Sequence, residues 1–572
     1  MSPKKYGLRK VDDSWWKENI NCLNACPAHT NVPDYISLVA NGNFQEAFNV
    51  NRKANIFPAI LGRICMHPCE KVCRRRHMDE PVAICALKRA AADHKPNNDG
   101  AGAAVCFPKR QRLAIVGAGP AGLTTADDLA RIGYEVTVFE ALSVAGGMLN
   151  VGIPPYRLDR KVIHAAIKEL EGIGVEIRLA TSVGRDVTLE QLQSHFDAVL
   201  IAAGAHEAVR LNIPGEALTG VLHGVTFMRK VNLKEKIYLG RKVVVIGGGN
   251  TAVDCARSAR YLGAKEVTII YRRTRNEMPV SAEELKEAEE EGVNIELLVS
   301  PLKVIGNKNG QVMGLKCIRN RLVEPDAGGR PKPVSIEGSE FVLKVDTVLP
   351  AVSQSPDTSF LSNIFSRSKW DRVEVDPKSL MTNVDGIFAV GDYITGPRDV
   401  ISVIADAHRV SASIHNYLHG KRKEETECCL QAAKPPHRVG SNYDALPRQK
   451  MPTLPAKERK EMEEEVQLGY SPEMAMMEAK RCLKCDYNIT VNSERCILCA
   501  GCVDVCPHGC IQMISLDQIE SDKAVMDLSH VKQGAVLFMD EEFCIRCGLC
   551  VHRCPTGAIR MERFEILTPV HY

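Results

Sequence analysis

The chain has 572 residues, of which 45% are hydrophobic and 25% are charged, and its formal net charge is +3. This composition excludes a wholly disordered chain, and the nearly balanced charge gives no reason to expect a nucleic acid or an anionic membrane as partner. No uninterrupted apolar stretch of about 18 residues occurs, so no membrane span is expected. The basic N-terminal residues are not followed by the apolar core that a secretory signal needs.

The unusual feature of the composition is its 22 cysteines. Most of them fall into two groups, one from Cys22 to Cys85 and one from Cys482 to Cys554. A secreted disulfide scaffold would be short and would lack the large apolar middle of this chain. Clustered thiols in a chain without a secretory signal instead predict metal centres in a reducing compartment, which we expect to be the cytoplasm.

In chain order, the Cys-rich N-terminal region contains helix-like stretches such as Val32–Ala54 and ends in a polar linker. From about residue 109 to 420, short β-branched runs alternate with helix-like stretches. Such alternation predicts βαβ units and parallel sheets. The fold class expected for this part is α/β, with two Rossmann-like dinucleotide-binding domains that the following motifs indicate.

The first of these β-branched runs, Leu113–Val116, leads into a glycine-rich turn and a helix-like stretch. In such a unit the first glycine makes the tight turn, the second lets a pyrophosphate approach the backbone, and the third packs the helix on the strand. The helix N-terminus faces the phosphates, and an acidic residue after the second strand binds a ribose hydroxyl. The dinucleotide-binding residues predicted here are Gly117, Gly119, Pro120, Ala121, Gly122 and Glu140.

A second copy of this unit follows the strand-like run Lys242–Ile246. Its predicted nucleotide-binding residues are Gly247, Gly249, Asn250, Thr251 and Ala252. Tyr271 stands where the first copy has its acidic residue, and Arg272 and Arg273 follow it. Arginines at this place suit the 2′-phosphate of NADP(H), whereas an acid would suit a free 2′-hydroxyl. The alternative is that both arginines are solvated surface charges.

A third segment, Thr382–Asp392, ends in Val-Gly-Asp and precedes a helix-like stretch. It resembles the terminal FAD signature of flavoproteins with two dinucleotide domains, in which Gly391 and Asp392 would lie at the flavin. The first glycine motif is therefore expected to bind FAD, and the second to bind NADP(H) in a domain inserted into the FAD domain. Because no cysteine lies between Cys106 and Cys255, a dithiol relay beside the flavin is disfavoured and iron–sulfur clusters are favoured as electron acceptors.

Two copies of one cysteine pattern lie near the end of the chain. Each reads C-x2-C-x2-C-x3-C-P, the run that binds [4Fe–4S] clusters in two-cluster ferredoxins, in which the fourth cysteine of each run ligates the other cluster. The pattern predicts one cluster at Cys496, Cys499, Cys502 and Cys554 and another at Cys544, Cys547, Cys550 and Cys506. Structural zinc sites also use C-x2-C pairs but rarely in such tandem runs. Cys510 aligns with Ala558 of the second copy and is interpreted as a small buried residue.

Several phrases outside these motifs carry a resemblance to a known family. They are Cys22-Leu-Asn-Ala-Cys26-Pro27, FPAILGRIC, Cys69-Glu70, Cys73, Gly146-Gly147-Met148 running into GIPPYR, GGGNTAVDCAR and RRTRNEMP. Across about residues 20–420 the chain resembles the small (β) subunit of NADPH-dependent glutamate synthase. It is also similar to the N-terminal half of dihydropyrimidine dehydrogenase and to the large subunit of NADH-dependent ferredoxin:NADP oxidoreductase. The resemblance adds Gly147, Met148 and Arg157 to the residues expected at the FAD.

That family places two [4Fe–4S] clusters in an N-terminal helical domain, where a C-x2-C pair precedes the phrase that Cys22 and Cys26 match. This chain has no cysteine before Cys22. The phrase that ends in Cys482 and Cys485 looks like the missing pair, and our hypothesis is that it folds back to complete the site. The resemblance then implies one cluster at Cys22, Cys73, Cys482 and Cys485 and another at Cys26, Cys65, Cys69 and Cys85. The alternative is that Cys482 and Cys485 bind zinc or no metal.

The expected domain organisation follows from these motifs. A helical iron–sulfur domain is expected at 1–108, the two parts of the FAD domain at 109–225 and 346–420, and the inserted NAD(P)-binding domain at 226–345. A linker that carries the Cys482 and Cys485 pair is expected at 421–490, and an α+β ferredoxin domain with two clusters at 491–572.

These expectations describe an FAD- and iron–sulfur-dependent NAD(P)H:acceptor oxidoreductase in which the protein positions the cofactors, so no catalytic side chain is predicted. The partner is expected to be another subunit of an electron-transfer complex or a soluble ferredoxin, and the family analogy admits electron bifurcation in a transhydrogenase complex. One alternative is a glutamate synthase small subunit, against which the terminal ferredoxin module argues. Another is a non-catalytic, cluster-carrying scaffold, against which the intact glycine motifs argue.

Overall fold

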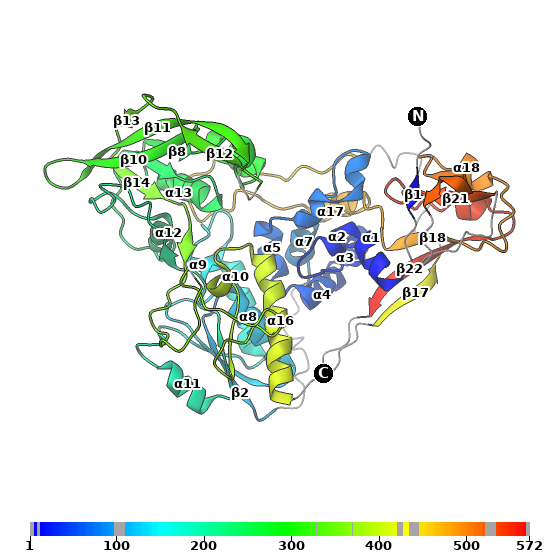
Figure 1. The fold of residues 1–572 in the computed structure, drawn as a ribbon, viewed down its shortest axis with the longest axis horizontal. Helices are drawn as coiled ribbons and strands as arrows, with labels where there is room; N and C mark the ends of the chain where they lie inside the picture. The colour runs from blue at the N-terminus through cyan, green and yellow to red at the C-terminus, as the bar shows by residue number, and fades with distance from the viewer. Residues whose placement is uncertain are drawn as a thin grey trace. The chain divides into compact units, whose positions relative to one another are not determined.

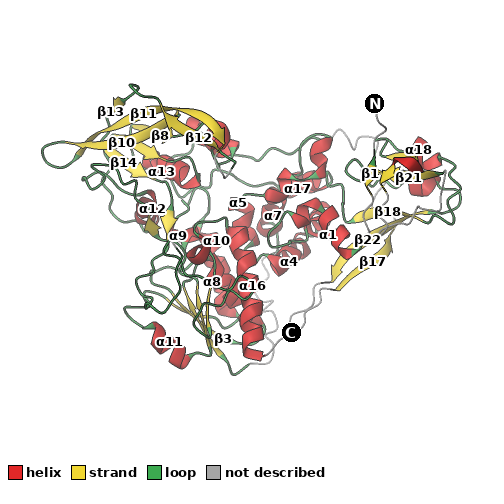
Figure 2. Ribbon diagram, in the orientation of Figure 1, coloured by secondary structure: helices red, strands yellow, loops and turns green. Residues whose placement is uncertain are grey.

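The computed structural model describes the chain except for residues 1–4, 8–11, 97–108, 326–328, 369, 420–426, 434–445, 521–533 and 568–572. The polar linker expected before residue 109 and part of the linker expected from residue 421 therefore lie outside the described residues. The structure forms two compact units, whose elements are drawn in Figures 1 and 2. Unit 1 contains Met1–Asp99, Arg422–Met451 and Gly469–His571, and unit 2 contains Gly100–Lys421 and Pro452–Leu468. Among the described helices, none combines the length and the apolar character needed to cross a bilayer.

Unit 2 contains a parallel five-stranded sheet in the order β16-β5-β2-β3-β4. Its strands are β2 (Arg112–Val116), β3 (Glu135–Phe139), β4 (Glu176–Arg178), β5 (Ala198–Ile201) and β16 (Ile387–Ala389). The apolar run in β2 is buried after its first residue, as a strand covered on both faces requires. Helix α8 (Pro120–Arg131) follows β2 directly, and α16 (Val400–His419) packs on α8. Strand β16 and helix α16, which both follow residue 386, thus complete the sheet that begins with β2 and the helix layer that begins with α8.

A second parallel sheet lies between β5 and β16 in the sequence, in the order β14-β7-β8-β9. Its strands are β7 (Lys242–Ile246), β8 (Glu266–Tyr271), β9 (Val293–Leu297) and β14 (Thr347–Pro350), with helices α12 (Gly224–Asn232), α13 (Asn250–Tyr261) and α14 (Ala282–Glu290). An antiparallel sheet is attached to it, formed by β10 (Val299–Gly306), β11 (Val312–Pro325), β12 (Pro331–Ser335) and β13 (Phe341–Leu343). The prediction of an α/β fold with two dinucleotide-binding sheets is confirmed.

Short elements complete unit 2. They are α9 (Met148–Val151), α10 (Arg160–Gly172), α11 (Leu189–His195), β6 (Glu207–Ala208), β15 (Gln354–Ser355), α15 (Asp392–Thr395) and the 3-10 helix η2 (Arg275–Glu277). The segment Pro452–Leu468 also belongs to this unit, and its Val466 N–H donates to the carbonyl of Tyr156 at 2.9 Å.

Unit 1 joins the N-terminal helices to the C-terminal module. The helices are α1 (Asp13–Asn19), α2 (Asn21–Asn24), α3 (Val32–Ala40), α4 (Phe44–Ala54), α5 (Pro58–Ile64), α6 (Pro68–Lys71), η1 (Arg74–His77) and α7 (Ile84–Asp93), and α17 (Pro472–Ala479) packs on α3 and α7. The module contains β17 (Glu427–Ala433), β18 (Tyr487–Val491), α18 (Gly501–Asp504), β19 (Ile511–Ser515), η4 (Leu516–Gln518), β20 (Ile519–Glu520), β21 (Ala535–Met539), α19 (Leu549–Arg553) and β22 (Ile559–Leu567). Strand β1 (Tyr6–Gly7) pairs with β20, so both ends of the chain share a sheet.

The core of unit 1 also draws on both ends of the sequence. Tyr35 of α3, which is fully buried, lies in one apolar cluster with Ala475 and Ala479 of α17. The buried ring of Trp16 stacks on Phe564 of β22 with centroids 5.6 Å apart. Burial of aromatic surface of this size contributes on the order of 2–3 kcal/mol per side chain. The C-terminal module is therefore held against the helices by an ordinary apolar core.

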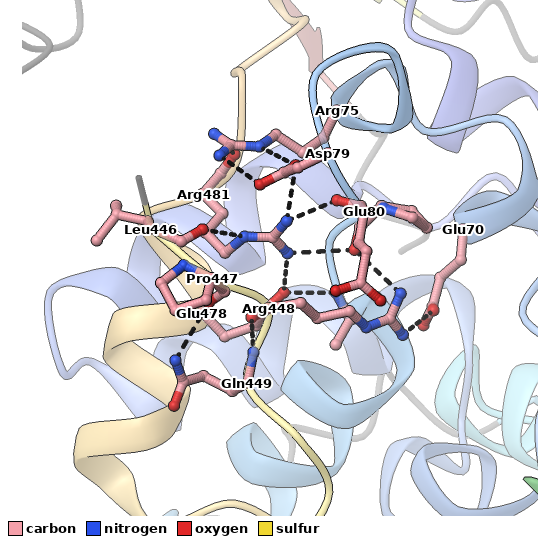
Figure 3. A network of polar contacts seen from close by, with 12 residues as sticks. Glu70, Arg75, Asp79, Glu80, Leu446, Pro447, Arg448, Gln449, Glu478 and Arg481 are labelled. Atoms are coloured by element: carbon pink, nitrogen blue, oxygen red, sulfur yellow. Dashed lines mark hydrogen bonds and ion pairs between the residues drawn. The ribbon is translucent and has the colours of Figure 1, made fainter. Parts of the chain in front are cut away.

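A polar network crosses the same junction (Figure 3). Glu478 and Arg481 are completely buried and form an ion pair at 2.8 Å. Arg481 also pairs with Asp79 at 2.9 Å, and Asp79 pairs with Arg75 at 2.7 Å. The two oxygens of Glu478 accept the backbone N–H groups of Ala83 and of Gln449, each at 2.8 Å. Because every charge in this network has a partner, residues 478–481 are fixed against the loop that follows η1.

Substituting Arg481 by methionine tests how much this network contributes. The change leaves the Glu478 carboxylate buried without its cation, which costs about 3–5 kcal/mol of folding free energy. We expect Arg481→Met to lower the free energy of unfolding of unit 1 by this amount in a urea titration. The control is Lys480→Met, the neighbouring exposed cation, which should change it by less than about 0.5 kcal/mol. Equal stabilities of the two variants would show that the buried pair is not a main support of this junction.

Candidate cofactor sites

A cavity of about 310 Å³ lies at the end of β2, between the glycine-rich turn and the start of α8. Two observations explain the glycines. Gly117 has φ of 107°, and a Cβ there would lie 2.5 Å from the carbonyl oxygen of Ala202, while a Cβ at Gly122 would lie 2.0 Å from the oxygen of Gly117. The turn therefore closes only with glycine, and it leaves its backbone open to the cavity. This cradle fits a dinucleotide whose pyrophosphate lies at the N-terminus of α8.

The acidic residue of this unit is placed as a ribose-binding group should be. One carboxylate oxygen of Glu140 accepts the N–H of Ala118 at 2.8 Å and the other accepts that of Leu142 at 2.8 Å. Burial raises the pKa of Glu140, and these N–H groups oppose the rise. The carboxylate is thus fixed at the cavity wall and retains acceptor capacity for hydroxyls.

Most of the residues predicted for the FAD line this cavity. They are Gly117, Gly119, Pro120, Ala121, Glu140, Gly147, Met148 and Asp392. Gly122 packs beneath the turn, and Gly391 lies with φ of 72° against the side chain of Ala121. Burial raises the pKa of Asp392 to about 6, although the backbone N–H of Arg398 donates to it at 3.0 Å.

Arg157 is placed differently from the other predicted residues. Its guanidinium pairs with Asp254 at 2.7 Å and with Glu284 at 2.5 Å, so it joins the FAD part of the unit to α13 and α14 instead of lining the cavity. Conversely, His206, Arg229 and Arg398 line the cavity although no motif marks them. Burial lowers the pKa of His206 to about 4, so this imidazole is neutral at pH 7.

The second glycine turn has the same design. Gly247 has φ of 151°, and a Cβ there would lie 2.3 Å from the oxygen of Ala351. Gly249 caps α13, which begins at Asn250 and carries Thr251 and the buried Ala252 in its first turn. The side chain of Arg272 is exposed, whereas Arg273 is buried and its Nε–H donates to the carbonyl of Pro331 at 2.8 Å. Of the two arginines, Arg272 is therefore the one free to reach a solvent-facing phosphate.

The C-terminal cysteines gather around two small cavities, each of about 20 Å³. One is lined by Cys496, Cys499, Cys502 and Cys554, so it takes its fourth thiol from the other run. The second is lined by Cys544, Cys547, Cys550, Cys506 and also Cys510. The sulfur of Cys510 lies 3.2 Å from that of Cys506, a proximity that the internal repeat does not indicate because the second copy has Ala558 there.

The N-terminal cysteines form two further groups. Cys22, Cys73 and Cys482 pack against one apolar cluster, and Cys22 and Cys485 pack against a second. Burial raises the pKa of Cys22, and the thiols of Cys485, Cys482, Cys73 and Cys69 raise it further. The structure thus brings the C-terminal C-x2-C pair to the N-terminal helices. The second group lies near Lys88 of α7. Burial alone would lower the pKa of Lys88, but four thiols raise it. Those thiols are Cys65, Cys85, Cys69 and Cys26.

The four groups fit iron–sulfur clusters by donor chemistry. Four thiolates are the ligand set of a [4Fe–4S] cluster, and each binds a different iron atom. Within the described part of the chain, no three His, Cys, Asp or Glu side chains converge closely enough to hold a single metal ion. A single zinc ion requires that convergence, with sulfur at about 2.3 Å from one point.

Comparison with known proteins gives three family matches. Residues 111–412 match the family described as pyridine nucleotide-disulphide oxidoreductase. Residues 17–100 match the 4Fe-4S cluster domain II of dihydropyrimidine dehydrogenase, and residues 495–558 match a 4Fe-4S dicluster domain. The matches cover the N-terminal cysteines, both ferredoxin runs and most of the α/β part between them, but not Cys482 and Cys485.

Curated relatives extend over most of the chain. The NADP(+)-dependent formate dehydrogenase subunit beta of Moorella thermoacetica is 41% identical over 497 residues, which cover 81% of this chain and 70% of that protein. The NADPH-Fe(3+) oxidoreductase subunit beta of Geobacter sulfurreducens is 38% identical over 506 residues, 81% of this chain and 75% of that protein. The glutamate synthase [NADPH] small chain of Azospirillum brasilense is 34% identical over 423 residues, 70% of this chain and 86% of that protein. The resemblance inferred from the motifs is confirmed, and the chain belongs to the pyridine nucleotide-disulphide oxidoreductase family as an FAD- and NADP(H)-dependent oxidoreductase that carries [4Fe–4S] clusters.

Proposed function

We propose that the chain is the electron-transferring subunit of a larger enzyme, which takes a hydride from NADPH and delivers single electrons through four [4Fe–4S] clusters to a partner subunit or a soluble ferredoxin. The observation that carries the proposal is the gathering of sixteen predicted ligand thiols into four groups of four in unit 1. One of these groups draws on thiols more than 400 residues apart in the sequence, and two draw on both ferredoxin runs, so the assembly of these three groups depends on the whole unit.

The flavin supplies the conversion of a two-electron hydride into single electrons. The residues of unit 2 bind and orient it. The N-terminus of α8 would hold the pyrophosphate and Glu140 would accept ribose hydroxyls, and Asp392 also lines the cavity. The neutral His206 adds a polar group to the cavity without adding charge.

The far end of the route is proposed to be the group formed by Cys496, Cys499, Cys502 and Cys554. Cys499 is exposed there, and its neighbours Ile497 and Leu498 are 64% and 41% exposed. An exposed apolar surface beside a cluster suits contact with another protein. Two of the curated relatives are named as beta subunits of a formate dehydrogenase and of an Fe(3+) oxidoreductase, which also supports a partner subunit.

The other functional hypotheses have less support. A glutamate synthase small subunit would not need the terminal ferredoxin module, and a scaffold without turnover would not need the intact FAD cradle. Coupling to NAD(H) by electron bifurcation rests on family analogy alone. A cytoplasmic location is supported by the clustered cysteines at iron–sulfur spacing, which suit a reducing compartment.

Mixing the anaerobically purified chain with NADPH tests the proposed route. We expect the flavin absorbance near 450 nm to be lost promptly, within about the time of one turnover. Bleaching of the broad cluster absorbance should follow, because the clusters accept electrons from the reduced flavin. Bleaching of the flavin without the clusters would contradict the electron-transfer role. The absence of flavin absorbance in the purified protein would favour the hypothesis of a non-catalytic, cluster-carrying scaffold.

The nucleotide preference depends on Arg272. Replacing it with alanine removes a charge-assisted contact to the 2′-phosphate, worth about 1.5–3 kcal/mol. We expect Arg272→Ala to raise KM for NADPH by about 10- to 100-fold and to leave KM for NADH within about twofold. Arg275→Ala is the control, because Arg275 is a nearby exposed arginine that pairs with Glu289. Equal effects of Arg272→Ala on the two nucleotides would remove the assignment.

Iron analysis tests the composite cluster at Cys22, Cys73, Cys482 and Cys485. The proposal predicts about sixteen iron atoms per chain, and about four fewer in a variant with Cys482→Ser and Cys485→Ser. Cys510→Ser is the control and should keep the full content, because Cys510 is not one of the predicted ligands. Loss of about one zinc atom from the double variant, with iron unchanged, would instead establish a zinc site.

A further inference from the structure

The two ferredoxin runs differ at one position in a way that the ligand pattern does not require. The first reads Cys496-Ile-Leu498-Cys499 and the second reads Cys544-Ile-Arg546-Cys547. Leu498 and Arg546 share the left-handed backbone conformation, with φ of 52° and 56°. Leu498 is 41% exposed, whereas Arg546 is 1% exposed. The same turn therefore presents an apolar side chain to solvent in one copy and buries a guanidinium in the other.

The buried guanidinium faces two of the thiol groups. Its Nε–H donates to the carbonyl of Tyr487 at 3.2 Å, two residues after Cys485, and its Nη1 donates to the carbonyl of Cys544. Tyr487 follows the C-x2-C pair of the composite group, and Cys544 begins the second ferredoxin run. Arg546 thus contacts the backbone of both cysteine segments.

Among the described residues Arg546 forms no direct ion pair, although the carboxylates of Glu541 and Asp486 lie near enough to favour its charge. Glu541 is occupied by the amides of Asn19 and Asn488, at 2.6 and 2.8 Å. Asp486 accepts the Nε–H of Arg563 through Oδ2 at 3.1 Å, and its Oδ1 is buried without a hydrogen-bond partner in the described part of the chain. The remaining guanidinium nitrogen of Arg546, Nη2, is buried and has no hydrogen-bond partner in the described part of the chain. A buried N–H without an acceptor costs about 1–3 kcal/mol, more for a charged group, and Nη2 therefore keeps a donor available for a cluster sulfur.

The electrostatic surroundings agree with this geometry. Burial alone would lower the pKa of Arg546, but the thiols of Cys485 and Cys544 raise it, followed by the carboxylates of Glu541 and Asp486. The two thiols belong to different predicted clusters. The hydrogen bonds of Arg546 to the carbonyls of Tyr487 and Cys544 place its positive charge between the segment after Cys485 and the start of the second ferredoxin run.

We propose that Arg546 is the positioning residue that couples the composite cluster at Cys22, Cys73, Cys482 and Cys485 to the ferredoxin cluster at Cys544, Cys547, Cys550 and Cys506. The inference rests on the proposed function. The step that Arg546 assists is the transfer of one electron between these two clusters, in which no bond forms or breaks and no proton moves, and NADPH is the source of the electron. Electrons then enter the terminal module at the Cys544 cluster and leave it at the exposed Cys499.

The physical basis is the effect of a buried cation on reduction. Adding an electron makes a cluster more negative, and a nearby positive charge in a low-dielectric interior favours that state. Hydrogen bonds to cluster sulfur have the same sign of effect on the potential. A guanidinium near two clusters raises the potentials of both, which an apolar residue such as Leu498 cannot do.

A redox titration of the full chain, poised with dithionite and mediators and followed by electron paramagnetic resonance, tests the proposal without depending on NADPH. We expect Arg546→Leu, which gives the second run the side chain of the first, to lower the midpoint potential of at least one cluster by about 59 mV. This corresponds to a tenfold smaller equilibrium constant for a one-electron reduction. Arg546→Lys, which keeps the charge, should restore most of the shift.

The matched control is Arg553→Leu, because Arg553 is exposed and lies near Cys499 of the other cluster. Solvent screens its charge, so the potentials should stay unchanged. Full iron content with unchanged potentials in Arg546→Leu would overturn the proposal. If that variant binds less iron, Arg546→Gln takes its place, and unchanged potentials there overturn the proposal equally. A wild-type protein that titrates normally but is not reduced by NADPH would refute the proposed function and leave this result standing.

Discussion

The buried ion pair between Glu478 and Arg481 is the interaction on which the arrangement of unit 1 depends. It lies at the end of α17, immediately before Cys482, and it is bound on both sides by groups from residues 70–83 and 446–449. A buried pair of this kind adds little net stability compared with apolar residues, but it is strict about geometry, because a misplaced partner leaves a charge unpaired. The network thus sets where the C-terminal thiols arrive on the N-terminal helices.

Unit 2 uses the same principle to relate its two nucleotide-binding sheets. Arg157 from the FAD part pairs with two carboxylates, one on α13 and one on α14. The guanidinium carbon of Arg257 lies 4.3 Å from the centroid of the Tyr156 ring. The segment Pro452–Leu468 spans both parts, since Val466 bonds to Tyr156 and Arg459 pairs with Glu290 and Glu291. A segment that lies far along the chain from either glycine motif therefore helps to fix the two dinucleotide-binding parts of unit 2 to each other.

Spacing in the sequence predicted those features that are built within a few residues. The glycine turns, the acidic Glu140 and the two ferredoxin runs are local designs, because tight turns and cluster loops impose fixed intervals on the chain. The role of Arg157 was not predictable, since its partners Asp254 and Glu284 come from another sheet and leave no interval in the sequence. The cavity residues His206 and Arg229 and the extra thiol Cys510 likewise depend on packing between distant segments.

The two copies of the internal repeat in the terminal module have different surroundings, and this difference bears on the direction of electron flow. Two runs with the same spacing would form two similar clusters, and the ligands alone give no reason for an electron to prefer one of them. Packing distinguishes the two runs, because Arg546 of the second run is buried while Leu498 at the same place in the first run is exposed together with Ile497 and Cys499. Leu549 of the second run is exposed as well. A buried unpaired cation is costly and an exposed apolar pair is unfavourable in water, so neither is explained by the stability of this chain alone. Both are explained if the inner position faces a second cluster and the outer position faces a partner protein.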